Sequence, residues 1–144
     1  MKVLPLLFSV IIVITACKGT ADKKVPELAE EMCSCFDSIK QNTTPEEMTV
    51  FKEVSVAAYP QEVLQNAVKK MDAAKAAAFA EKLKSVGDKT SPVYVCLQQF
   101  DKKHEKETIQ DKKAFTEKLF AQLQANNCVI GAAIVNLGLK AQNN

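Results

Sequence analysis

The sequence contains no arginine and no tryptophan, and its only histidine is His104. Arginine makes bidentate contacts with phosphate and guanine edges, so its absence argues against nucleic-acid recognition and a dedicated phosphate site. A single histidine excludes multi-histidine metal sites and most histidine-based triads. Glycine-rich phosphate loops, haem-attachment sequences and nucleophile-elbow serines are also missing. We therefore expect no enzymatic activity, no cofactor and no nucleic-acid partner.

The charged residues are spread along the chain rather than gathered in blocks. The formal net charge of the chain is +2, and lysine supplies its basic side chains. Acids and lysines alternate in the stretch 101–107, which is typical of a solvated helix face. We expect His104, which lies in this stretch, to face solvent.

The first residues have the layout of a secretory signal. Met1 and Lys2 give a short positive region, and the apolar run 3–14 follows it. This run is too short to cross a membrane, which takes about 20 apolar residues. Because a polar stretch begins at Lys18, the sequence predicts that residues 1–16 are removed.

The tetrapeptide Ile14-Thr15-Ala16-Cys17 resembles the lipobox of bacterial lipoprotein signal peptides. The resemblance implies that Cys17 receives a diacylglyceryl group, that the bond before it is cut, and that the new amino terminus is acylated. Two or more acyl chains give lasting membrane attachment. The alternative is an ordinary secretory signal with a cysteine at its boundary by chance.

The resemblance implies a location in the bacterial cell envelope, with the membrane as partner through the lipid. Lys18 is not the acidic residue that favours inner-membrane retention in some bacteria, so we prefer the outer membrane. The domain would then face the periplasm or the cell surface, with an envelope protein as a further partner to be identified. We expect a flexible tether over residues 17–24.

The rest of the chain predicts a single all-α domain over residues 25–140, followed by a disordered tail at 141–144. Removing 16 of 144 residues leaves 128, a length suited to one core. Apolar residues recur at spacings of three and four, and proline, Thr44 and Ser91 give helix-start signals. We expect a bundle of about five to six short helices at 26–40, 45–58, 61–86, from 92, at about 109–126 and at 128–139.

The last predicted helix, 128–139, is apolar on almost every side. A helix of this kind is normally central in a bundle, and it is too short to span a bilayer. We interpret it as a core helix, with a docking or dimerising tail as the alternative.

Four cysteines remain once Cys17 is assigned to lipid, and they are Cys33, Cys35, Cys96 and Cys128. An exported chain folds where thiols are oxidised, so we expect two disulfides. On a helix Cys33 and Cys35 are about 200° apart and cannot readily bridge each other. The pairing is therefore either 33–96 with 35–128 or 33–128 with 35–96, and the sequence leaves both open.

Cys33 and Cys35 also suggest an alternative function, a copper or zinc site completed by Cys96, Cys128 or His104. A redox pair is not expected, because Cys-x-x-Cys spacing and a helix N-terminus are both missing from the sequence pattern. The lipobox, the Cys-x-Cys on a first helix and the later single cysteines together resemble small uncharacterised helical lipoproteins of Bacteroidota. That resemblance implies no activity.

Overall fold

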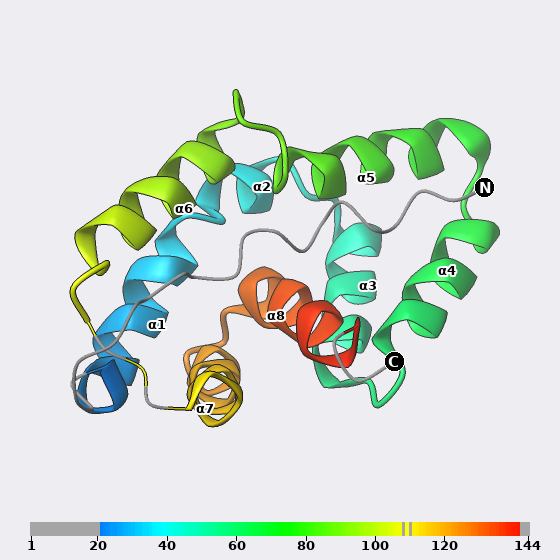
Figure 1. Ribbon diagram of the computed structural model, residues 1–144. Helices are drawn as coiled ribbons and strands as arrows, with labels where there is room; N and C mark the ends of the chain where they lie inside the picture. The colour runs from blue at the N-terminus through cyan, green and yellow to red at the C-terminus, as the bar shows by residue number, and fades with distance from the viewer. Residues whose placement is uncertain (1–20, 108, 110, 142–144) are drawn as a thin grey trace.

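A computed structural model describes residues 21–107, 109 and 111–141 (Figure 1). This part of the chain is all-α, as the sequence predicts, and contains no strand. The proposed signal peptide, Cys17 and residues 142–144 lie outside the described residues. In chain order the elements are the 3₁₀ helix η1 (Ala21–Lys24), α1 (Val25–Ser34), α2 (Asp37–Gln41), α3 (Pro45–Val56), α4 (Pro60–Lys70), α5 (Ala73–Ser85), α6 (Pro92–Lys103), α7 (Lys112–Ala125) and α8 (Val129–Ala141).

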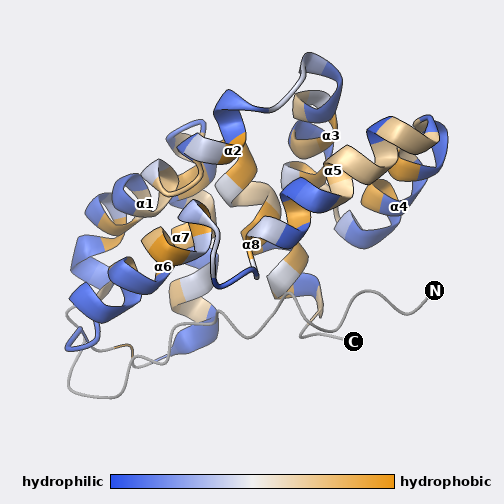
Figure 2. Cartoon of the chain, turned by 90° about the horizontal axis from the view of Figure 1, so that it is seen from above, coloured by the Kyte–Doolittle hydropathy of each residue, from blue (hydrophilic) through white to orange (hydrophobic). Residues whose placement is uncertain are grey.

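Helix α8 forms the centre of the bundle, where it packs against α3, α7, α4 and α1 (Figure 1). Its sequence is apolar on nearly all sides because neighbouring helices surround it, and Figure 2 shows its high hydropathy. The core interpretation of this segment is therefore correct. The buried residues of α8 are Ile130, Gly131, Ala132, Ala133, Asn136, Leu137 and Gly138.

The described helices number eight, whereas the sequence predicted five to six, because two predicted helices are each divided. The segment expected to be helical from 26 to 40 turns after Ser34, where the Phe36 N–H bonds the Cys33 carbonyl three residues back. The segment expected at 61–86 breaks at Met71, whose backbone is extended, and Asp72 then caps α5. An Asp72 side-chain oxygen accepts a hydrogen bond from Lys75 N at 2.9 Å.

Other helix starts agree with the local signals. Thr44 and Glu47 form the expected capping box at the start of α3, and the Ser91 hydroxyl accepts from Tyr94 N at the start of α6. Pro60 begins a new helix, as its disruption of the helical ladder predicts. The chain thus begins helices where short motifs specify them.

Residues 21–24, expected to belong to a flexible tether, form the helix η1. Ala21 is fully buried, and Lys118 Nζ of α7 lies 3.1 Å from Asp22 Oδ1. Residues 21–24 are therefore helical and in contact with α1 and α7. Ala21 is part of the buried cluster that these helices form.

Candidate functional site

The four cysteines of the domain form two disulfides. Cys33 is bonded to Cys128, with Cα atoms 5.8 Å apart, and Cys35 to Cys96, with Cα atoms 5.4 Å apart. The prediction of two disulfides is confirmed, and one of the two pairings left open is the observed one. Helix α1 contacts both α8 and α6. Cys33 lies in the last turn of α1 and Cys35 directly after its end, and the two sulfurs reach the start of α8 and α6 respectively.

The predicted metal alternative finds no support in this geometry. Cys33 and Cys35 are bonded to different partners, and neither sulfur is a free thiolate. His104 Nε2 lies 2.9 Å from Glu31 Oε2. In the part of the chain that the structure describes, no three histidine, cysteine or acidic side chains gather as a metal site.

His104 is largely covered rather than facing solvent, which corrects the expectation for this residue. Its side chain is 12% exposed and packs on the Phe100 ring, with centroids 4.9 Å apart. Glu31 also accepts from Lys103 Nζ at 2.9 and 3.0 Å. The hydrogen bond from the Lys103 ammonium, helped by His104, lowers the pKa of Glu31 despite partial burial. This cluster joins α1 to the end of α6.

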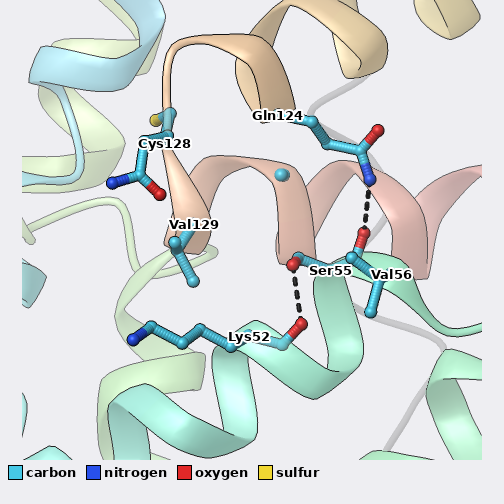
Figure 3. A pocket seen from close by; sticks show the side chains of 8 residues that line it. Lys52, Ser55, Val56, Gln124, Cys128 and Val129 are labelled. Carbon is cyan, nitrogen blue, oxygen red and sulfur yellow. Dashed lines mark hydrogen bonds between the residues drawn. The ribbon is translucent and has the colours of Figure 1, made fainter.

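A hollow of about 340 Å³ lies between the end of α3, the end of α7 and the start of α8 (Figure 3). We call it the Gln124 hollow, because Gln124 lines it and the Gln124 amide donates to the Ser55 carbonyl at 2.9 Å. The Ser55 hydroxyl donates to the Lys52 carbonyl at 2.8 Å, so it is not poised as a nucleophile. The six lining residues labelled in Figure 3 are Lys52, Ser55, Val56, Gln124, Cys128 and Val129.

A second hollow, of about 370 Å³, adjoins the first and shares Val56 and Gln124 with it. We call it the Phe120 hollow; its wall also includes Glu117 and Lys140. Val56 is 74% exposed, and Tyr59, on the connection from α3 to α4, is 70% exposed. Val56 lies in the wall of both hollows, and Tyr59 follows Ala58 of the Phe120 hollow in the sequence. Single exposed apolar residues are common, whereas exposed apolar residues that gather mark contact surfaces.

The wall of the Phe120 hollow includes a buried amide, that of Asn136, which the sequence patterns did not predict. Asn136 is 2% exposed, and its Nδ2 donates to the carbonyls of Val54 at 2.8 Å and Ala57 at 2.9 Å. These carbonyls belong to the end of α3, where the last carbonyls of a helix lack regular helical partners, and Val54 O accepts only a long bond of 3.4 Å from Ala57 N. The available signal was a lone asparagine inside the apolar run 129–139.

Comparison of the chain with protein-family models, curated proteins and solved structures finds no match. Among the helices of the described ranges, none is long and apolar enough to cross a bilayer. The description of the site therefore depends on the chain's own geometry, which offers two disulfides and a hollowed, partly apolar surface.

Proposed function

We propose that this protein is a lipid-anchored, non-enzymatic binding or structural module of the bacterial cell envelope. The anchor is Cys17, and the outer membrane is the preferred location. Two disulfides support export, because cytosolic thiols are kept reduced while exported chains are oxidised. The lipobox supports attachment after export, and both features point to the same compartment.

The surface that supports binding is formed by the Gln124 hollow, the Phe120 hollow and the exposed side chains of Val56 and Tyr59. Aromatic residues are enriched at protein interfaces, whereas polar and charged residues form their rims. Lys52 and Lys140 supply such a rim here. We assign this surface to an envelope protein partner.

The anchor is tested by expressing the full chain and a Cys17→Ser variant in a bacterium that processes lipoproteins. The wild-type chain should begin at Cys17, carry the mass of the acyl groups and fractionate with membranes. The Cys17→Ser variant should carry no lipid and leave the membrane fraction or stay uncleaved, while a Thr20→Ser control should behave as wild type. An unlipidated wild-type protein would contradict the anchor.

The contact surface is tested separately, by placing a photo-crosslinking residue at position 56 or at position 95. Val95 is the matched control, because it is also an exposed valine, 43% exposed, but lies on α6. We expect a discrete protein adduct in cells from position 56 that is lost with Tyr59→Lys. Adducts of equal yield from both positions, or none from position 56, would contradict this assignment.

A further inference from the structure

The helix η1 leaves only a short piece of chain between the packed bundle and the proposed lipid. Ala21 is fully buried in the cluster that α1 and α7 form. Asp22 makes an ion pair with Lys118 of α7, with Oδ1 and Nζ 3.1 Å apart. Because Cys17 precedes Ala21 by four positions, the proposed anchor is joined closely to a residue that is fixed on the bundle.

The length of this connection limits how the anchored domain can be oriented. Four residues span at most about 14 Å when fully extended, so Ala21 lies within about 14 Å of Cys17 and hence of the bilayer surface. A compact domain of this size has a radius of gyration of about 14 Å, which corresponds to a diameter of about 35 Å. The end of the domain opposite η1 therefore stays at least about 20 Å from the bilayer surface. A free chain over the whole predicted tether, 17–24, would span up to about 29 Å and would allow almost any orientation.

The surface around η1 combines three segments of the chain. The ion pair between Lys24 and Glu107 joins η1 to the residues that follow α6, and η1 also contacts the α7 helix. Figure 1 shows the blue η1 beside the yellow connection that leads to α7, with α4 on the far side of the molecule. Figure 2 likewise places α1 and α4 on opposite sides. We call residues 21–24, 105–107 and 111–113 the η1 end.

The η1 end has the composition of a surface that meets polar headgroups. Its exposed side chains carry both signs of charge and include Lys23, Glu105, Lys106, Asp111, Lys112 and Lys113. The large apolar side chains that are exposed in the described ranges, Val56, Tyr59 and Val95, all lie elsewhere. Charged side chains are costly in the hydrocarbon core, so this surface fits the headgroup layer and does not insert further.

We propose that the η1 end is the membrane-facing surface of the anchored protein and lies against phospholipid headgroups, while the connection from α4 to α5 points away from the bilayer. This orientation rests on the proposed lipid at Cys17. Because the charges of the η1 end are mixed, the short connection to Ala21 sets the orientation, and a net electrostatic attraction is not needed.

The orientation is tested with the lipidated full chain in phosphatidylcholine vesicles, carrying a fluorescent amino acid at position 113 or at position 69. Lys69 is the matched control, because it is also an exposed lysine in a terminal helical turn, but lies on α4. A nitroxide on the lipid headgroup should quench position 113 at least about threefold more strongly than position 69, because their distances from the bilayer differ by about 20 Å. A nitroxide deep in the acyl chains should quench neither. Equal quenching of both positions by the headgroup label, or strong quenching of position 113 by the deep label, would overturn the proposal.

A longer connection tests whether the short chain sets this orientation. About fifteen glycine and serine residues inserted between Gly19 and Thr20 leave the lipobox and η1 unchanged and add an average reach of about 20 Å. We expect the quenching of position 113 to fall and its difference from position 69 to narrow. An unchanged difference would contradict the role of the short connection. Mass spectrometry checks the lipid in each sample: protein without lipid would contradict the anchor and this orientation together, whereas lipidated protein with equal quenching would contradict the orientation alone.

Discussion

At the scale of single residues, the sulfur of Cys128 leaves too little room for a side chain at position 131, where the chain has glycine. A Cβ at this position would lie 2.9 Å from Cys128 Sγ and 3.3 Å from two carbons of the Phe36 ring. Alanine favours a helix over glycine by about 1 kcal/mol, but overpacking a core costs about 1–3 kcal/mol. We expect Gly131→Ala to lower the free energy of unfolding by about 1 kcal/mol, measured by chemical denaturation.

The same substitution should cost less once the sulfur is absent. In a Cys33→Ala, Cys128→Ala background only the contact with Phe36 remains, so the helix-propensity gain of Gly131→Ala weighs more. An equal cost in both backgrounds would show that the sulfur is not the obstacle.

Asn136 is a second residue with a specific structural role, because its side-chain amide binds backbone carbonyls at the end of α3. Its amide donates to the Ala57 carbonyl and to the Val54 carbonyl, which otherwise accepts only a long bond of 3.4 Å from Ala57 N. Leaving a buried acceptor unsatisfied costs about 1–3 kcal/mol. We expect Asn136→Leu, which preserves size, to lower the free energy of unfolding by about 2 kcal/mol. Asn66→Leu, on the exposed face of α4, is the control and should change it by less than about 0.5 kcal/mol.

At the scale of helices, the sequence predicts starts better than ends and interruptions. Thr44 and Ser91 each accept a hydrogen bond from the backbone N–H three residues later, so a few neighbouring residues specify those starts. Asp72 gives the same kind of local signal, but the apolar spacing continues on both sides of it and suggests one helix. The turn after Ser34 has no strong breaker in its sequence. The position of this turn depends on how α1 and α2 pack against other helices, and the neighbouring residues in the sequence do not determine that packing.

The junction of α3 and α5 gives a pH-dependent prediction. Burial alone would raise the pKa of Glu47, but the hydrogen bonds from Lys82 Nζ and from Thr44 N outweigh it and hold the pKa below 4.5. A carboxyl whose pKa is lowered by folding stabilises the fold above its unfolded pKa, and this contribution disappears as the pH falls through the folded value. The wild-type free energy of unfolding should therefore fall as the pH drops below about 4.5.

The Glu47→Gln variant should be less stable at neutral pH and should show a flatter decline over that acidic range. Lys82→Met should also flatten the decline, because it removes the charge that opposes the effect of burial. The measurement is the free energy of unfolding at a series of pH values. Parallel curves for wild type and Glu47→Gln would show that Glu47 does not contribute.

At the scale of the whole molecule, the sequence predicted the all-α class, the two disulfides and the central place of α8. These depend on composition, cysteine count and a one-sided or all-round apolar pattern, which are properties of the chain alone. The choice between the two pairings depends on which flank of α1 faces α6 and which faces α8. The hollows depend on how three helix ends meet at Gln124 and Cys128. The disulfide pairing and the hollows are features of the tertiary structure, and the spacing of residues along the sequence does not determine them.

The disulfides link distant parts of this molecule, and their removal should lower its stability mainly through the unfolded chain. The bonds close separations of 95 and 61 residues, for which the chain-entropy model gives about 4 kcal/mol each. We expect Cys33→Ala, Cys128→Ala to lose slightly more free energy of unfolding than Cys35→Ala, Cys96→Ala.

Native-state hydrogen exchange separates the two variants further. Losing Cys35–Cys96 should speed exchange mainly in α6, whereas losing Cys33–Cys128 should speed it in α8 and in the helices around it, because α8 is central. Equal acceleration throughout the chain in both variants would mean that the two bonds stabilise only through the unfolded state. A local effect confined to α6 in both would contradict the central role of α8.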